Sequence, residues 1–171
     1  MEIKTLRGAL RKATLADAEF IFQLLNQDGF KRFIGDRNIH SISDAKRYIE
    51  SAFLNSYGVH GLCSPYIFAL HDGTALGISG FYHRRALQLP DLGFAFLEQV
   101  AGQGYAFEAC QAICQFGFEK LQLPRLNAIL MNTNHRSRKL LSRLAFQDVG
   151  QIIINEDKRP IALMELVPTT S

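Results

Sequence analysis

Residues 92–106 read Leu-Gly-Phe-Ala-Phe-Leu-Glu-Gln-Val-Ala-Gly-Gln-Gly-Tyr-Ala, and this stretch decides the fold. Its first six residues are typical of a strand, and residues 103–120 predict a long helix because apolar residues return at helical spacing. Between them lie Gly102 and Gly104, which adopt backbone angles that other residues resist. Such a turn points several N–H groups the same way, and a helix N-terminus adds partial positive charge. The stretch therefore favours a binding site for an anion such as a pyrophosphate.

Two glycines alone fit an ordinary strand-to-helix turn as well. The turn is not a Walker A loop, because no Gly-Lys-Ser/Thr follows it. It also lacks the third glycine of the Gly-x-Gly-x-x-Gly motif of dinucleotide-binding folds.

Outward from this turn, strand and helix patterns are interleaved. Some predicted strands are joined by hairpins, such as the one at Asp72-Gly73, and others by helices. The sequence therefore predicts the α/β class with a mixed central sheet. Gly58 is the expected end of the second helix, and a polar turn at 155–158 joins the last two strands. The expected strands cover 6–11, 66–70, 75–82, 92–97, 126–131, 148–154 and 161–166, and the expected helices cover 14–25, 41–55, 103–120 and 135–144.

Length and composition predict a single domain over residues 1–171. A chain of 171 residues fits one domain. A hydrophobic fraction of 47% excludes a disordered chain, and three cysteines are too few for a disulfide scaffold. No run of about 20 apolar residues is present, so no membrane span is expected. The N-terminus has no apolar signal-peptide core, so we expect a cytoplasmic protein.

Charge and cysteine spacing exclude two further classes of site. A net charge of +3 is too small to indicate a nucleic-acid partner, so none is expected. Cys110 and Cys114 lie four residues apart, on one face of the predicted helix. No second Cys or His pair stands at ligand spacing, so we expect core packing and no metal.

A second segment, residues 132–146, carries concentrated positive charge. Residues 121–147 contain no acid and five bases, namely Arg125, Arg136, Arg138, Lys139 and Arg143. Such a run is typical of a solvated helix face. It equally favours local attraction for a second phosphate group.

Together, the two segments resemble a known family. Gln99-x-x-Gly102-x-Gly104-Tyr-Ala is similar to the Q/R-x-x-G-x-G/A loop of the GNAT superfamily of N-acetyltransferases. Residues 134–146, Asn-x-x-Ser-x-x-Leu-Leu-x-x-Leu-x-Phe, resemble a helix of its Rim-type branch, which includes ribosomal-protein N-terminal acetyltransferases. The opening residues 10–21 are also similar. The resemblance implies the GNAT fold: a twisted mixed sheet with helices on both faces and a splayed strand pair that binds CoA.

The resemblance also implies acetyl-CoA as cosubstrate. Phe96 and Leu97 would pair with the pantetheine arm, which Asn134 would also contact. Arg138 of the basic helix would also bind the cofactor. The pyrophosphate would lie on Gly102, Gln103, Gly104, Tyr105 and Ala106.

For catalysis, the resemblance implies direct transfer of the acetyl group to a primary amine, with no acyl-enzyme. Asp91 would be the base, although it also fits a simple loop cap after Pro90. Many relatives have a Tyr on the last helix where this chain has Leu141, so Ser137 would stabilise the departing thiolate. A helix-surface serine is the alternative.

The acceptor amine would be a protein N-terminus or a small molecule. The expected loop 28–36 would form one wall of its groove, with Phe30, Arg32 and Phe33 as lining residues or, alternatively, as core packing. His83 would line the same groove or be structural. The chain is expected to be a monomer or a homodimer.

Two further positions depart from the family pattern. Ala145 replaces the usual Gly before Phe146, and a non-Gly residue in the left-handed region costs about 1 kcal/mol. Ala101 stands where many Rim-type proteins have Trp.

Two other functions fit part of the sequence. A non-catalytic acyl-CoA-binding module would keep the glycine loop without the base. A basic RNA-associating domain would rest on the charged segment alone, without the aromatic platforms of single-strand binders.

Overall fold

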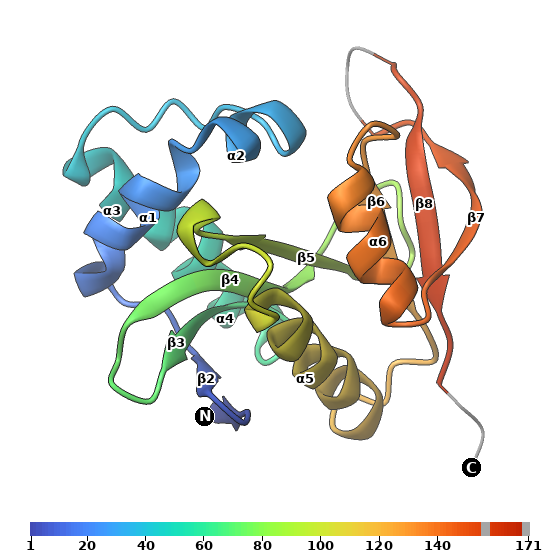
Figure 1. The fold of residues 1–171 in the computed structure, drawn as a ribbon, viewed down its shortest axis with the longest axis horizontal. Helices are drawn as coiled ribbons and strands as arrows, with labels where there is room; N and C mark the ends of the chain where they lie inside the picture. The colour runs from blue at the N-terminus through green and yellow to red at the C-terminus, as the bar shows by residue number, and fades with distance from the viewer. Residues whose placement is uncertain (155–157, 169–171) are drawn as a thin grey trace.

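A computed structural model describes residues 1–154 and 158–168 (Figure 1). One eight-stranded sheet runs through the described residues in the order β1-β2-β3-β4-β5-β6-β8-β7. Every neighbouring pair is antiparallel except β5 and β6, which are parallel, so the predicted mixed sheet is confirmed. The strands are β1 (Glu2–Lys4), β2 (Gly8–Arg11), β3 (Pro65–Leu70), β4 (Ala75–Tyr82), β5 (Asp91–Phe96), β6 (Leu126–Leu130), β7 (Gln147–Ile152) and β8 (Ile161–Leu166).

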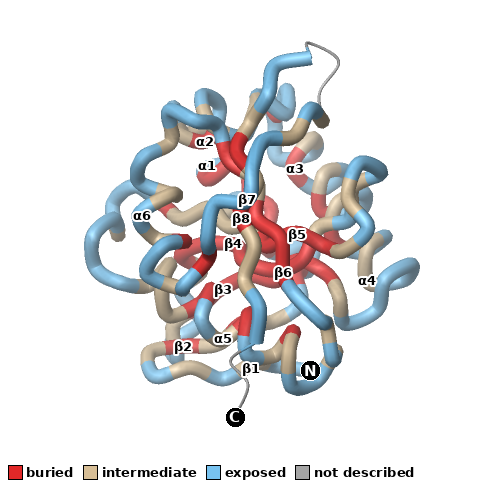
Figure 2. Tube along the Cα trace, turned by 90° about the vertical axis from the view of Figure 1, so that its right-hand side faces the viewer, coloured by how far each residue is buried: buried red, intermediate tan, exposed pale blue. Residues whose placement is uncertain are grey.

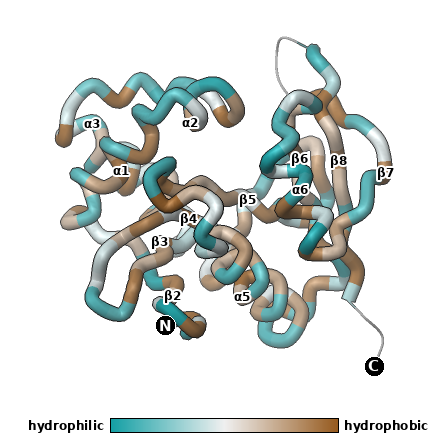
Figure 3. The backbone as a smooth tube through the Cα atoms, in the orientation of Figure 1, coloured by the Kyte–Doolittle hydropathy of each residue, from teal (hydrophilic) through white to brown (hydrophobic). Residues whose placement is uncertain are grey.

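The helices are placed by two buried clusters, one on each face of the sheet. Residues of α1 and α3 pack against Ile67 and Ile78, whereas α5 and α6 pack against Phe68 and Phe81. Figure 2 shows the buried strands between exposed helix surfaces, and Figure 3 shows hydrophobic residues along β3, β4 and β5. The helices are α1 (Ala18–Leu25), α2 (Asp28–Phe33), α3 (Ile42–Ile49), α4 (Asn55–His60), α5 (Tyr105–Glu119) and α6 (His135–Arg143).

Three expectations from the sequence were wrong in detail. Residues 28–33 form the helix α2 rather than a loop, because fewer than two turns show no helical period. Strand β1 was missed for the same reason, since three residues show no alternation. Gly58 does not end its helix: a π-helical segment, Glu50–Leu54, joins α3 to α4, and the chain turns at Gly61, whose φ is 58°. Most of the polar turn predicted at 155–158 lies outside the described residues.

Cys110 and Cys114 belong to α5 and are buried in the core, as the sequence predicted. In the part of the chain that the structure describes, no helix has the length and hydropathy needed to cross a membrane.

Helix α6 ends in a Schellman motif built on an alanine. The N–H of Phe146 donates to the carbonyl of Leu141, and the N–H of Ala145 donates to the carbonyl of Ser142, both at 3.0 Å. This geometry requires a left-handed residue, and Ala145 supplies it with φ of 70°. The helix therefore keeps its end despite the missing glycine, at the cost of backbone strain.

We predict that Ala145→Gly raises the free energy of unfolding by about 1 kcal/mol, because glycine adopts this conformation without a Cβ clash. The melting temperature should rise by roughly 2–4 °C for a chain of this size. Ala112→Gly, inside α5, is the control and should lower stability by about as much. Urea denaturation of both variants measures the difference. A loss of stability in Ala145→Gly would contradict the backbone strain assigned to Ala145.

Candidate active site

The parallel strands β5 and β6 pair at one position only, Asp91 with Asn127. On its other edge, β5 pairs with β4 at six positions, from Tyr82–Asp91 to Gly77–Phe96. Strand β6 is likewise fully paired with β8. The two strands therefore meet at their N-terminal ends and then separate, which confirms the splayed pair. Figure 1 shows β5 running between the two parts of the sheet. The β6-facing edge of residues 92–96 keeps backbone groups that no strand satisfies.

A glycine turn leads from β5 into α5 and leaves the helix N-terminus open. Gly102 and Gly104 have φ of 75° and 83°. Gly104 is the N-cap of α5 and provides no side chain to bond the first N–H groups. Among the described residues, the N–H groups of Gly104, Tyr105 and Ala106 have no acceptor. Several parallel donors at a positive helix end can hold an anionic group such as a phosphate.

Sequence reasoning missed one residue at this turn, Arg7, which precedes β2. Its guanidinium donates to the carbonyl of Gln103 at 2.8 Å and lies 4.0 Å from the centre of the Tyr105 ring. No local pattern signals this contact, because the partners are about a hundred residues apart in the chain.

Helix α6 begins beside the end of β6. The side chain of Asn134 caps the helix, because its Oδ1 accepts the N–H of Ser137 at 3.1 Å. Ser137 is half-buried, and within the described residues its hydroxyl has no hydrogen-bond partner. Arg138 is engaged elsewhere, since its guanidinium donates to Asp148 on β7. The hydroxyl of Ser137 is thus free to bind a ligand atom.

Asp91 lies at the closed end of the split. Its side chain is 1% exposed and accepts a hydrogen bond from Arg84 Nε at 2.8 Å. Burial raises the pKa of Asp91 above its ordinary value, and the Arg84 charge opposes this shift without cancelling it. Arg84 belongs to the loop between β4 and β5, so the ion pair also closes that loop. The raised pKa makes this carboxylate a stronger proton acceptor than an exposed aspartate.

The residues expected to line an acceptor groove are not all in one place. Phe30 is only 5% exposed and packs in the core, whereas Arg32 is exposed over the half-buried ring of Phe33. Their helix α2 lies next to the end of β5, because the side chain of Gln27 bonds the carbonyl of Phe96 and the N–H of Glu98.

His83 has a different setting. Its ring stacks on His60 with centroids 3.7 Å apart, and its Nε2 lies 2.9 Å from the carbonyl oxygen of Cys63. The pair borders a cavity of about 190 Å³, which Ser51 and Tyr82 also line.

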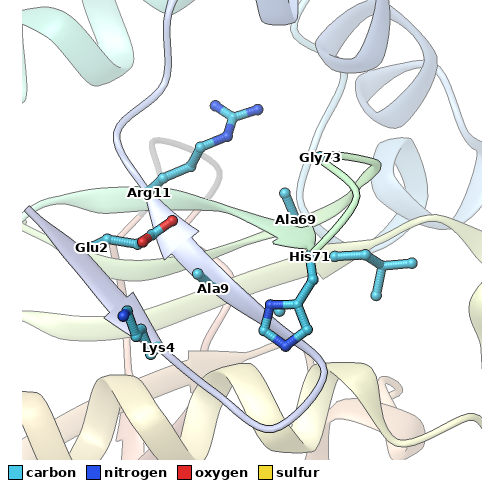
Figure 4. Close-up of a pocket in the computed structure, with 9 residues that line it drawn as sticks. Glu2, Lys4, Ala9, Arg11, Ala69, His71 and Gly73 are labelled. Atoms are coloured by element: carbon cyan, nitrogen blue, oxygen red, sulfur yellow. The ribbon is translucent and has the colours of Figure 1, made fainter.

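A larger cavity, of about 380 Å³, lies at the edge of the sheet that β1 and β2 form (Figure 4). Glu2 and Lys4 of β1, Arg11 of β2 and His71 after β3 line it. Strand β4 separates this edge from β5. Its lining mixes both charge signs and includes no open helix terminus, so the split remains the candidate active site.

Comparisons with known proteins agree with this geometry. Residues 7–147 match the family model described as an acetyltransferase (GNAT) domain. The chain is 29% identical over 153 residues to the uncharacterized N-acetyltransferase YoaA of Bacillus subtilis (strain 168), covering 86% of this chain and 84% of that protein.

Two solved structures show the same fold. RimL, a ribosomal L7/L12 alpha-N-protein acetyltransferase in complex with coenzyme A, superposes with a TM-score of 0.83 at 15% identity and covers 98% of both chains. RimJ of Mycobacterium smegmatis, in complex with CoA-disulfide, gives a TM-score of 0.81 at 19% identity over 98% of this chain and 87% of that one.

We predict that Gly77→Ala distorts the split. A Cβ at Gly77 would lie 2.4 Å from the ring of Phe96, so that this ring or the strand that carries it, β5, has to shift. Overpacking of this kind typically costs about 1–3 kcal/mol of unfolding free energy. The matched control is Gly58→Ala in α4, where no atom lies within 4 Å of the new Cβ and helix propensity favours alanine. If both variants gained stability in urea denaturation, the packing of Phe96 on Gly77 would be contradicted.

Proposed function

The chain belongs to the GNAT acetyltransferase family and is an acetyl-CoA-dependent acetyltransferase, and on that premise we propose that it transfers the acetyl group directly to a primary amine. The acceptor is a protein N-terminus or a small-molecule amine. The observation that carries the proposal is the split, which closes at Asp91 and opens toward the uncapped N-terminus of α5.

The chain offers the groups that acetyl-CoA needs. The N–H groups of residues 104–106 hold the pyrophosphate at the positive end of α5. The free edge of residues 92–96 pairs with the amides of the pantetheine arm. Its N–H groups also polarise the carbonyl under attack. Bound acetyl-CoA supplies the activated thioester.

The attacking amine has to be neutral, since an ammonium ion has no lone pair. An α-amine with a pKa near 8 is about 10–20% neutral at pH 7, whereas a lysine amine is neutral only ~0.04% of the time. Asp91 takes the proton that the amine nitrogen loses as the C–N bond forms. Because Asp91 is buried, a water molecule carries that proton to it.

Ser137 completes the reaction on the leaving side. As the C–S bond breaks, its free hydroxyl donates a hydrogen bond to the departing thiolate. The buried cysteines do not act as acyl carriers, because burial raises the pKa of the Cys110 thiol to about 12. The high pKa of this thiol supports direct transfer without an acyl-enzyme.

Turnover with a panel of amines tests the proposal. Purified protein is mixed with acetyl-CoA and with peptides that have free N-termini, polyamines or amino acids. Released CoA thiol is measured together with the mass of the acetylated amine. Acetylation of a panel member supports the proposal. Binding of acetyl-CoA without acetyl transfer to any amine would favour a non-catalytic binding module instead.

We predict that Asp91→Asn lowers kcat by at least ~10²-fold, because it removes the proton acceptor and keeps the shape of the side chain. The wild-type kcat/KM profile should fall on the acidic side at a pH above the ordinary aspartate range, and the variant should lack this limb. Asp44→Asn, at another arginine-paired aspartate, is the control. An unchanged kcat with an intact acidic limb would leave Asp91 as a loop-closing residue only.

We predict that Ser137→Ala lowers kcat about tenfold, the effect of one lost hydrogen bond to a charged group. Unfolding free energy should stay within about 0.5 kcal/mol, because the hydroxyl has no partner in the described protein. Ser142→Ala, on an exposed position of the same helix, is the control. Equal kcat values for the two variants would rule out a role for Ser137 at the leaving group.

A further inference from the structure

Arg7 fastens the start of the chain to the first turn of α5. Its Nε donates to Glu108 Oε2 at 2.6 Å, and its backbone N–H donates to Glu108 Oε1 at 2.7 Å. Its Nη1 donates to the carbonyl of Gln103 at 2.8 Å. One residue therefore contacts both the glycine turn and the helix that follows it.

The Arg7 side chain also links the turn to the core. Its guanidinium lies over the Tyr105 ring, and that ring lies 6.1 Å from the ring of Phe68 on β3. Phe68 in turn lies 5.8 Å from Phe96 on β5. A continuous series of ring contacts thus connects the turn with the end of the splayed strand.

Gly104 leaves the space that this arrangement needs. A Cβ at Gly104 would lie 3.3 Å from Nη2 of Arg7, so that the guanidinium passes closely over the turn. Arg7 therefore lies beside the helix terminus whose N–H groups have no acceptor.

The negative charge of Glu108 is the reason why the anion-binding end of α5 needs a cation beside it. A carboxylate in the first turn of α5 lies close to the same N–H groups that hold an anion. Burial alone would raise the pKa of Glu108, but the hydrogen bonds from Arg7 and Thr5 outweigh burial and lower it. Glu108 is therefore ionised at neutral pH, and its negative charge would repel a bound phosphate unless a cation offset it.

We propose that Arg7 is a positioning residue for the cofactor: it holds residues 102–106 in their anion-binding conformation and offsets the charge of Glu108 beside the bound pyrophosphate. The inference rests on the proposed function, because it assumes that this turn binds acetyl-CoA. It adds a requirement for a residue far from the family's glycine loop in the sequence.

Calorimetric titration with acetyl-CoA tests the inference with four variants. Arg7→Met should weaken binding at least about tenfold, the effect of losing hydrogen bonds to a charged group. Combining it with Glu108→Gln should recover part of that loss, because the uncompensated charge is gone. In a turnover assay, Arg7→Met should raise KM for acetyl-CoA and leave kcat within about twofold. Arg11→Met, which breaks a similar arginine–carboxylate pair with Asp17, should bind as the wild type does.

Three results would overturn the inference. Arg7→Met could bind acetyl-CoA as tightly as Arg11→Met does, or the double variant could recover no affinity. The third is an Arg7→Met variant with a lower kcat and an unchanged KM for acetyl-CoA. If Arg7→Met does not fold, Glu108→Gln alone decides. It retains the Arg7 side chain and removes the negative charge of residue 108, so it should bind acetyl-CoA at least as tightly as the wild type, and weaker binding overturns the proposal. Failure of the wild-type protein itself to bind acetyl-CoA would instead contradict the proposed function.

Discussion

The incomplete pairing of β5 and β6 is the constraint on which the rest of the structure depends. Unpaired backbone groups in a sheet interior are costly unless another partner satisfies them. Both strands are anchored on their outer edges, β5 by β4 and β6 by β8, so the sheet stays intact while its centre opens. The side chain of Asn127 bonds the carbonyl of Leu89 at 3.3 Å and holds the closed end. The opening thus follows from the architecture and leaves a polar edge that a ligand can pair with.

In the proposed function, the groups around the split divide into a cofactor end and an acceptor end. The uncapped terminus of α5 lies at the open end, where it favours an anion, and Arg7 lies beside it and offsets the charge of Glu108. Asp91 and Arg84 lie at the closed end, where burial raises the pKa of the carboxylate. In the proposed function, phosphate binding and proton transfer are therefore separated along one strand, β5. One end would bind the charged cosubstrate, and the other would keep the proton acceptor out of bulk water.

Sequence patterns could predict the elements that have a strong hydrophobic period or a glycine at their turn. The turn at Gly102–Gly104, the helix α5 and the hairpin at Asp72-Gly73 were all predicted and are present. Elements shorter than two turns or four residues, such as α2 and β1, were missed because they are too short for their period to repeat. Contacts such as Arg7 with Glu108 depend on tertiary packing across 101 residues, and no local pattern contains them.

Hydrogen exchange of backbone amides, followed by NMR with and without acetyl-CoA, tests the central claim most directly. The account predicts that acetyl-CoA slows exchange at the amides of residues 104–106 and at the β6-facing amides of residues 92–96, since within the described residues these N–H groups include donors that no strand or helix satisfies. Exchange in the cavity residues of β1 and β2 should stay unchanged. Binding of acetyl-CoA that protects the β1–β2 edge, and leaves residues 92–96 and 104–106 as they are in the free protein, would contradict it.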